Sequence, residues 1–433
     1  MVLEMRKMKD SGIEWIGEIP EGWEIVPVRS CFDEVRTKNT DGQEQNALQF
    51  KSGNIISKTN FNASMDDYVA DTITNYTVVL PDTVMINGLN LNYDFKSLRV
   101  ALVKEKGVIT SAYLAIFPDR KKISPQYATY LFKGYETKMA FHNMGAGIRK
   151  TLGYKEFKNQ PLLLPSEKEQ NKISAYLDSK CSHIDIMLSK IRSSIEEYKK
   201  LKQAVITQAV TKGVRGEREM KDSGVEWIGE IPKEWVIQKI KSISSRINVG
   251  VVIRPSEYFD ENGTVPFLRG INVKEYLISS DNMVYINESS NRILSKSQVH
   301  TDDILIVRDG SIGTSCVVPA EFDGANVVSM VIATPSISCD SRFICYSLNS
   351  DVGKTQFTLT KIGSALTHTS VSAVSDIIVA VPSCAEQKEI ADYLDAKCVE
   401  IDGLIAKKEQ LVKELESYKK SLIYEVVTGK REV

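Results

Sequence analysis

Two stretches of the chain place apolar residues three and four positions apart, the spacing that is typical of long amphipathic helices. The first, residues 166–212, contains neither proline nor glycine, and Gly213 stands where a helix would end. The second begins at residue 383 and is less regular, with Lys408 and Lys419 at apolar positions, where a long side chain can lie along the seam. Because each apolar stripe is narrow and the remaining positions are charged, we expect the two helices to form an antiparallel coiled coil.

The expected contact positions follow this spacing in both helices. They are Ile184, Leu188, Ile191, Ile195 and Tyr198 in the first helix, and Ile401, Ile405, Val412, Leu415 and Leu422 in the second. Ser166 and Glu169 fit a capping box at the first helix start. At 1.5 Å per residue, 30–45 helical residues span about 45–65 Å, which predicts a rigid spacer. The alternative is that each helix packs on its own globular domain.

Outside the helices, short apolar runs predict strand-rich domains of irregular α/β (α+β) class. In residues 29–160 the expected strands are 76–80, 84–86, 97–103 and 114–117, with a helix near 125–132. In residues 241–380 they are 265–268, 303–308, 315–318 and 327–332, with a helix near 342–347. Each region then passes through a glycine-containing loop, 145–151 or 363–368, and a final strand leading into Pro165 or Pro382.

The parts around these two regions are repeated. The segment Met8–Pro20 returns as 220–232, and the Glu-Gln…Tyr-Leu-Asp pattern from Glu169 returns from Glu386. A duplicated frame with two different inserts predicts a pseudo-twofold arrangement. The expected segments are a first Trp-containing repeat (1–28), a first domain (29–164), a central helix (165–213), a link with the second repeat (214–240), a second domain (241–381) and a C-terminal helix (382–433).

The four tryptophans, Trp15, Trp23, Trp227 and Trp235, all lie in or just after the short repeat. We expect them to anchor a loop against the base of a helix, with contact to a partner protein as the alternative. Since the first repeat would follow naturally after the second helix in a circular chain, we also expect the two termini to meet.

Composition excludes several classes of protein. The chain has no run of about 18 apolar residues and no apolar leader, and its seven cysteines include no CxxC pair, so we expect a cytoplasmic protein with free thiols. Cys181 and Cys398 occupy matching positions and are expected to be core residues. Net charge is −1, but residues 29–160 hold 18 Lys and Arg against 13 Asp and Glu, whereas 241–380 hold 11 against 14. If both regions bind DNA, the second must use a local basic surface.

Base edges are recognised by Arg, Lys, Asn and Gln side chains, and phosphates by Lys and loop amides. On this basis the candidate DNA-binding residues of the first domain are Lys51, Asn87, Asn90, Asn92, Tyr93, Lys96, Arg149 and Lys150. Those of the second domain are Arg269, Asn272, Arg308, Ser311, Lys361 and Thr367. For each of them, a solvated loop or structural turn is the alternative.

Catalytic motifs are missing from the sequence. There is no phosphate-binding GxxxxGK[ST], no HExxH and no [DN]PP[YF], and the four histidines lack metal-ligand spacing. We therefore expect no catalytic residue and no metal site. Asp119, Glu156 and Lys158 fit a nuclease pattern only loosely, and nothing similar marks the second domain.

The repeated Trp-Ile-Gly-Glu-Ile-Pro element, the Pro-Ser-x-x-Glu-Gln helix starts at Pro165 and Pro382, and the Tyr-Leu-Asp…Lys-Cys…Ile-Asp helices resemble the specificity (S) subunit of type I restriction-modification systems. The resemblance covers essentially the whole chain and is weakest inside the inserts. Gly403 and the serine-rich middle of the first helix (Ser189, Ser193 and Ser194) depart from the family pattern.

This resemblance implies that the inserts are target-recognition domains and that the helices set the gap in a bipartite double-stranded DNA site. It also implies a non-catalytic chain that docks methylation (M) subunits, two of them, and restriction (R) subunits. S-adenosylmethionine, ATP and Mg²⁺ are then expected in those partners and not in this chain. Because the inserts differ, we predict an asymmetric site. The alternative is a structural adaptor whose domains bind proteins and not DNA.

Overall fold

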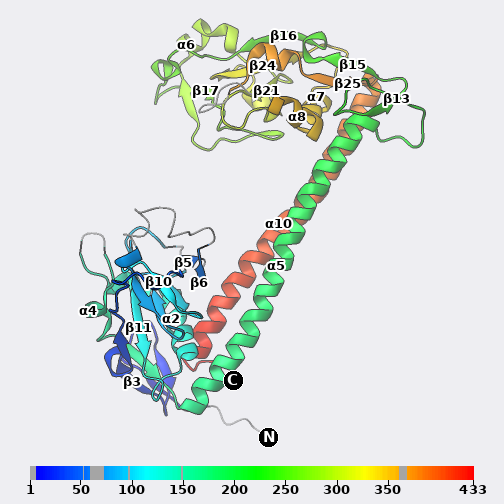
Figure 1. Ribbon diagram of the computed structural model, residues 1–433. Helices are drawn as coiled ribbons and strands as arrows, with labels where there is room; N and C mark the ends of the chain where they lie inside the picture. The colour runs from blue at the N-terminus through cyan, green and yellow to red at the C-terminus, as the bar shows by residue number, and fades with distance from the viewer. Residues whose placement is uncertain (1–5, 52, 59–72, 96–97, 148–149, 360–367) are drawn as a thin grey trace. The chain divides into compact units, whose positions relative to one another are not determined.

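The computed structural model describes residues 6–51, 53–58, 73–95, 98–147, 150–359 and 368–433. The chain divides into two compact units: unit 1 comprises residues 1–192 with 410–433, and unit 2 comprises residues 193–409. Both boundaries fall inside the long helices α5 (Glu167–Lys212) and α10 (Cys384–Val427) (Figure 1). Each unit therefore holds one strand-rich domain and a part of each long helix.

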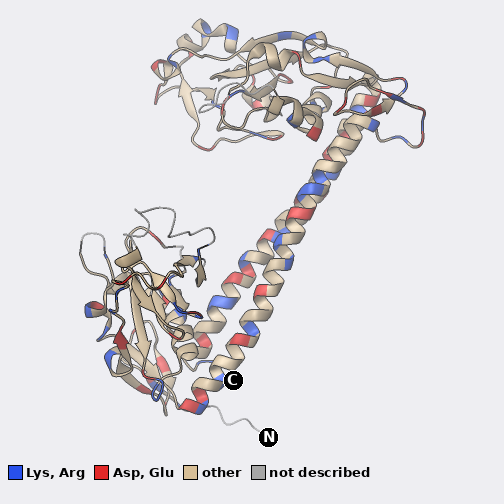
Figure 2. Cartoon of the chain, viewed as in Figure 1, with Lys and Arg blue, Asp and Glu red and all other residues tan. Residues whose placement is uncertain are grey.

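The long helices pair in antiparallel fashion inside each unit, as the apolar spacing predicts. In unit 1, Lys419 Nζ of α10 lies 2.6 Å from Asp185 Oδ1 of α5. In unit 2, Lys202 Nζ of α5 lies 2.7 Å from Asp402 Oδ2, and Lys408 Nζ lies 5.5 Å from the ring centroid of Tyr198. Lys408 and Lys419 thus lie in the contact between the two helices. The ammonium group of Lys408 lies over the Tyr198 ring, and that of Lys419 pairs with the Asp185 carboxylate. Residues of both signs are interspersed along the two helices (Figure 2).

The predicted contact positions face inward to different degrees. The buried ones are Ile184, Leu188, Ile195, Ile401 and Leu422, and the half-buried ones are Ile191, Tyr198, Ile405, Val412 and Leu415. Cys181 and Cys398 are also buried, in the cores of units 1 and 2 respectively. This is the packing role that their matching positions predict.

The domain of unit 1 is built on a four-stranded antiparallel sheet, against which α2 packs at β8 and β9. The sheet order is β4 (Phe32–Glu34), β11 (Leu114–Pro118), β8 (Val84–Ile86) and β9 (Val100–Leu102). The remaining elements are β1 (Met8–Asp10), β2 (Glu18–Pro20), β3 (Glu24–Pro27), β5 (Leu48–Lys51), β6 (Asn54–Ser57), β7 (Thr77–Val79), β10 (Gly107–Ile109), α2 (Pro125–Thr137), α3 (Ala140–Met144), α4 (Tyr154–Phe157) and β12 (Pro161–Leu164).

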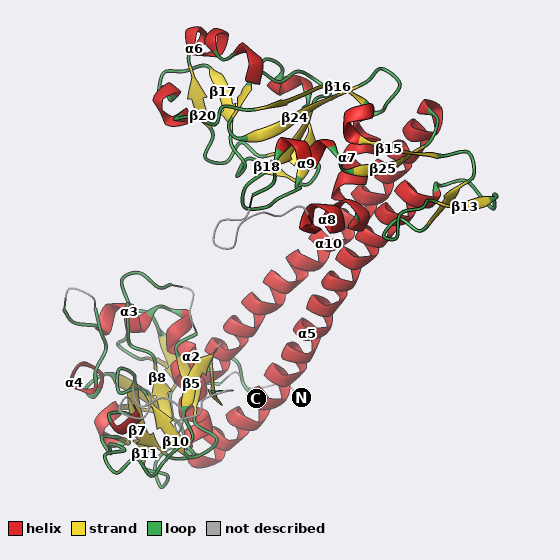
Figure 3. Cartoon of the chain, turned by 45° about the horizontal axis from the view of Figure 1, so that its top comes forward, coloured by secondary structure: helices red, strands yellow, loops and turns green. Residues whose placement is uncertain are grey.

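Unit 2 repeats this plan with different sequence. Its sheet order is β16 (Ser244–Val249), β24 (Met330–Pro335), β21 (Ile304–Val307) and β22 (Ser315–Val317), with α7 (Ser341–Asn349) and α9 (Val371–Ser375) against it (Figure 3). Strand β12 pairs with β3 in unit 1, and β25 (Ile378–Val381) pairs with β15 (Val236–Lys239) in unit 2. The other elements are β13 (Met220–Asp222), β14 (Glu230–Pro232), β17 (Val265–Leu268), β18 (Val273–Lys274), β19 (Leu277–Ile278), β20 (Val284–Ile286), α6 (Glu288–Ile293), β23 (Asn326–Val327) and α8 (Asp351–Leu359).

Most predicted strands and both short helices are confirmed, but the run 327–332 is wrong as a single strand. It is divided between β23, which pairs in parallel with β17, and β24, which belongs to the four-stranded sheet. Ser329 separates them with a φ of 50°. A left-handed residue turns the chain sharply, so a continuous apolar run can serve two sheets.

Trp15, Trp23 and Trp235 of the tryptophan repeats pack in the cores at the ends of the long helices, as predicted, whereas Trp227 is 39% exposed. Trp23 is buried with the last turns of α10, and Trp235 is buried with the last turns of α5. The Tyr424 hydroxyl donates to the carbonyl oxygen of Trp15 at 2.6 Å, and Lys172 Nζ donates to that of Val433 at 3.1 Å. The N-terminal repeat therefore meets the C-terminal residues in unit 1, as the circular order of the repeats predicts.

The repeated Glu-Gln motif fastens each domain to its long helix. Gln170 Oε1 accepts the N–H of Ser124, which caps α2, and Gln387 Oε1 accepts that of Asp340, which caps α7. The predicted capping box is only half right. The N–H of Glu169 donates to Ser166 Oγ at 3.4 Å, but the glutamate side chain pairs with Arg6.

Candidate nucleic-acid interface

In unit 1, two of the loops that carry candidate residues lie against each other beside the sheet. Loop 1a (87–99, with 87–95 and 98–99 described) joins β8 to β9. Loop 1b (145–153, with 145–147 and 150–153 described) joins α3 to α4. The N–H of Leu152 donates to the carbonyl oxygen of Gly88 at 2.9 Å, and that of Leu91 to Lys150 at 3.2 Å. A Cβ on Gly88 would lie 2.5 Å from the Leu152 carbonyl oxygen, so this close approach requires glycine.

The equivalent loops of unit 2 meet in the same way. Loop 2a (308–314) joins β21 to β22, and loop 2b (360–370) precedes α9, with 368–370 described. The N–H of Thr369 donates to the carbonyl oxygen of Arg308 at 3.1 Å, and Arg308 Nε donates back to that of Thr369 at 3.0 Å. Both units thus bring together two loops that the sequence marked separately.

Loop 1a presents its candidate side chains unequally. Asn87 Oδ1 accepts the N–H of Leu89 at 3.2 Å, which is a turn contact, and Asn92 is half-buried. Asn90 is exposed at a φ of 53°, and Tyr93 is 73% exposed. Asn90 and Tyr93 are therefore the candidates of this loop that are most open to a ligand.

The two described candidate lysines of unit 1, Lys51 and Lys150, are both exposed and lie near loop 1a. Lys150 lies in loop 1b, and its carbonyl oxygen accepts the Leu91 N–H. Lys51 ends β5, and the adjacent turn lies against loop 1a, because a Cβ on Gly53 would be 3.0 Å from Leu98 Cβ. Four candidates lie outside the described residues: Lys96, Arg149, Lys361 and Thr367.

In unit 2 the structure separates Asn272 from the other candidates. Asn272 is fully buried, and its Nδ2 donates to the carbonyl oxygens of Ser279 and Asp281. Its Oδ1 accepts the N–H of Arg269, so this amide holds the loop and is not available to a base. Arg269 and Arg308 are half-buried and Ser311 is exposed, which leaves these three as the described candidates.

Sequence reasoning missed Arg99, the buried last residue of loop 1a. It is 1% exposed, and its backbone N–H donates to Glu136 Oε1 of α2. Burial raises the pKa of Glu136 to about 7, against the lowering effects of the Arg99 N–H and the nearby guanidinium. The sequence predicted Arg99 inside the strand 97–103, whereas β9 begins at Val100, so only tertiary packing reveals this cluster.

The Glu136 pKa predicts a pH-dependent stability. Because the folded-state pKa exceeds the ordinary value of 4.5, the folded state binds more protons, and stability falls as pH rises from about 4.5 to 7. Glu136→Gln keeps the acceptor for Arg99 and removes the titration. Between pH 5 and pH 8 we expect the variant to gain about 2 kcal/mol relative to wild type, measured by urea unfolding. An unchanged difference between the two proteins over this range would contradict the assignment.

The residues of the loose nuclease pattern have structural partners. Asp119 Oδ1 accepts the N–H of Lys121, and Glu156 Oε2 accepts that of Gly153 at the start of α4. Within the described part of the chain, no three His, Cys, Asp or Glu side chains gather as a metal site. None of the described helices is long and apolar enough to cross a membrane.

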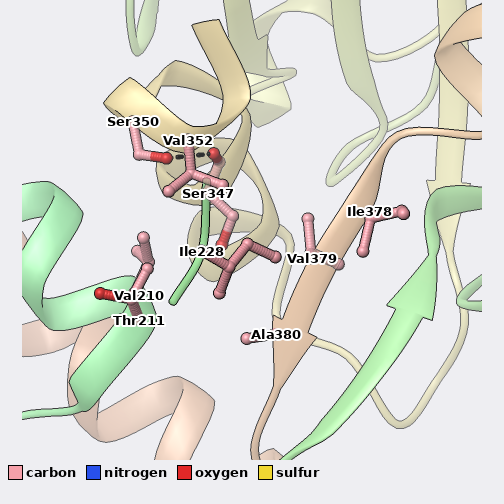
Figure 4. A pocket seen from close by; sticks show the side chains of 9 residues that line it. All are labelled: Val210, Thr211, Ile228, Ser347, Ser350, Val352, Ile378, Val379 and Ala380. Carbon is pink, nitrogen blue, oxygen red and sulfur yellow. Dashed lines mark hydrogen bonds between the residues drawn. The ribbon is translucent and has the colours of Figure 1, made fainter. Parts of the chain in front are cut away.

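A small cavity in unit 2 lies between the end of α5, the start of α8 and β25 (Figure 4). Its volume is ≈ 10 Å³, about that of one water position. Ser350 Oγ donates to the Ser347 carbonyl oxygen, and Thr211 Oγ1 to that of Thr207, so both hydroxyls are satisfied. This cavity is a packing gap and not a small-molecule site.

Comparison with protein families assigns the second half of the chain. A model described as type I restriction modification DNA specificity domain matches residues 232–415. Residues 232–415 are therefore similar to a type I specificity domain. They include β15 to β25 and most of α10, and therefore the loops 2a and 2b described above.

The likeness extends over the whole chain. A putative type I restriction enzyme MjaX specificity subunit from Methanocaldococcus jannaschii is 25% identical over 427 residues, which are 96% of this chain and 95% of the relative. The MjaVIII specificity subunit from the same organism is 24% identical and covers 99% and 98% of the two chains. The predicted resemblance to type I specificity subunits is thus confirmed.

Solved structures share the fold. One chain, from work on the complex assembly and conformational transition of the type I R-M system, superposes with a TM-score of 0.72 at 14% identity and covers 95% of this chain and 99% of that one. The HsdS subunit from Thermoanaerobacter tengcongensis gives a TM-score of 0.50, also at 14% identity, with 95% and 98% coverage. The chain, with its strand-rich domains and long helices, therefore shares the fold of these solved chains.

Proposed function

We propose that this chain is the DNA-recognition subunit of a type I restriction-modification system and that it binds a bipartite, asymmetric site. The observation that carries the proposal is the pair of equivalent loop clusters in units 1 and 2. They occupy the same place in the same topology, yet loop 1a offers Asn90 and Tyr93 whereas loop 2a offers Arg308 and Ser311. Different donors and acceptors at equivalent places favour two different half-sites.

The long helices take the role of spacer and docking element in this proposal. Helix α5 has 46 residues and α10 has 44, and an α-helix rises 1.5 Å per residue, so helix length would set the gap between half-sites. The chain itself carries out no catalytic step. Two methylation subunits would use S-adenosylmethionine, and restriction subunits would use ATP and Mg²⁺, in complex with this chain on double-stranded DNA.

The test is a map of the methylated motifs in DNA from cells that carry this chain and its methylating partner. Exchange of residues 29–164 for those of another specificity subunit is expected to change one half of the motif only. Removal of one turn, about four residues, from each long helix is expected to alter the gap and leave both halves intact.

Two outcomes would count against the proposal. A change in both halves after exchange of one domain would contradict modular recognition. A methylating partner complex that binds DNA in a gel shift without sequence preference would favour the structural adaptor instead.

A further inference from the structure

Arg99 holds loop 1a through its main chain. Its Nη1 donates to the carbonyl oxygens of Asn87 at 2.9 Å and Leu89 at 2.8 Å, and its Nη2 donates to that of Asp94. One planar guanidinium thus joins the two sides of the loop, because its donors point in fixed directions. All three of these hydrogen bonds go to backbone oxygens, and the Asp94 carboxylate adds an ion pair, with its Oδ2 3.6 Å from Arg99 Nη2. The hydrogen bonds determine the shape of the loop without using the Asn90 and Tyr93 side chains.

His142 of α3 supports the same loop from a second direction. Its Nε2 lies 3.1 Å from the Asp94 carbonyl oxygen, and its ring stacks on Phe95 with centroids 5.1 Å apart and an interplanar angle of 12°. The N–H groups of Tyr93 and Asp94 both donate to the Asn90 carbonyl oxygen, at 3.1 and 3.0 Å. Arg99 and His142 therefore hold the backbone of residues 87–94 through its carbonyl groups, while the Asn90 and Tyr93 side chains remain exposed.

We propose that Arg99 is a positioning residue for DNA specificity: it holds residues 87–95 of loop 1a in one shape so that Asn90 and Tyr93 meet the bases of the unit 1 half-site in fixed register. The inference rests on the proposed function and assigns one determinant of one half-site. Hydrogen bonds to base edges depend strongly on geometry, and a loop ordered in advance loses less entropy on binding. Arg99 would then influence which bases are preferred without touching DNA.

Replacing Arg99 should change the preference for bases in the unit 1 half-site only, because different contacts hold loop 2a of unit 2. Loop 2a has seven residues against thirteen in loop 1a, and Arg308 at its start donates to the Thr369 carbonyl oxygen. The guanidinium of Arg99 has no counterpart of this kind among the described contacts of loop 2a.

The test compares three variants of the full-length chain with wild type. Each purified protein selects the DNA duplexes that it binds from a library in which both half-sites are randomised. The exchange of residues 29–164 described above shows which of the two half-sites unit 1 recognises. Arg99→Met is expected to lose roughly 10-fold or more of the discrimination in that half, with the other half unchanged within about twofold. Arg99→Lys keeps the charge but cannot bridge three carbonyl groups, so an intermediate loss is expected. Arg36→Met removes an exposed arginine of the same domain and should leave both halves unchanged.

Hydrogen exchange separates positioning from general support. In Arg99→Met the peptide covering 87–95 should exchange faster, while peptides from β4, β11 and α2 keep their wild-type rates. If Arg99→Met does not fold, the same two measurements on Arg99→Lys decide the question.

Unchanged discrimination in the unit 1 half despite faster exchange of loop 1a would overturn the inference, as would an equal loss in both halves. A wild-type chain that selects no two-part sequence would instead overturn the proposed function, so the two failures are distinguishable.

Discussion

Replacing Arg218 by methionine is expected to lower the free energy of unfolding by about 3–5 kcal/mol. The Arg218 guanidinium donates to Glu386 Oε1 and lies 5.7 Å from the ring centroid of Trp235. The Glu386 side chain is only 3% exposed, so the variant would leave a buried carboxylate. Arg215, whose Nη1 is 3.7 Å from Glu386 Oε2, is 50% exposed and replaces little of the lost contact.

The chain contains its own control for this prediction. Arg6 in unit 1 pairs with Glu169 and lies 5.4 Å from the Trp23 ring centroid, in the same arrangement. The Arg6 and Glu169 side chains are each 28% exposed, so solvent can replace the lost contact. Arg6→Met should therefore lower the free energy of unfolding by about 1 kcal/mol or less. Combining Arg218→Met with Glu386→Gln should recover much of the loss. Denaturant unfolding of wild type, the two single variants and the double variant measures these differences. Equal losses of unfolding free energy in Arg6→Met and Arg218→Met would refute the role of burial.

Gly429→Ala is expected to destabilise unit 1 by about 3–4 kcal/mol, from backbone strain and overpacking together. Gly429 has a φ of 73°, and a Cβ there would lie 2.3 Å from Cγ and Cδ of Pro20. A proline ring cannot rotate away, so the N-terminal repeat would have to move off the end of α10. Thermal unfolding would show the loss as a lower midpoint.

Gly12→Ala separates the two contributions to this effect. Gly12 has a φ of 68°, but its Cβ would meet nothing within 4 Å, so only backbone strain of about 1 kcal/mol is expected. If both variants lose the same stability, the contact between Pro20 and Gly429 contributes nothing.

The elements that could be predicted are those with a local signal. The three- and four-residue spacing of apolar side chains located α5 and α10 to within one residue at the predicted start of each helix, because helical periodicity is a property of the segment itself. The run 327–332 was misassigned because periodicity does not tell which sheet a strand joins. The turn at Ser329 depends on the packing of both sheets around it.

The loops that carry the candidate residues could be predicted, but the exposure of the individual side chains could not. Loop composition correctly marked the described parts of loops 1a, 1b and 2a, because Asn, Gly and Ser signal turns. That these loops bind DNA stays a prediction. Composition could not separate Asn90, which is exposed, from Asn272, whose amide holds a turn. That difference arises from which backbone groups lie nearby in space.

The sequence by itself determined the duplicated frame, the two long helices, the two inserts and the likeness to type I specificity subunits. These properties depend on local periodicity and on repetition along the chain. Only the tertiary structure decided which repeated residues are buried and which loops meet. Glu169 and Glu386 occupy equivalent positions in the sequence, yet their side chains are 28% and 3% exposed. Arg99 holds loop 1a through three carbonyl groups, and because every residue has a carbonyl group, such contacts leave no trace in the sequence.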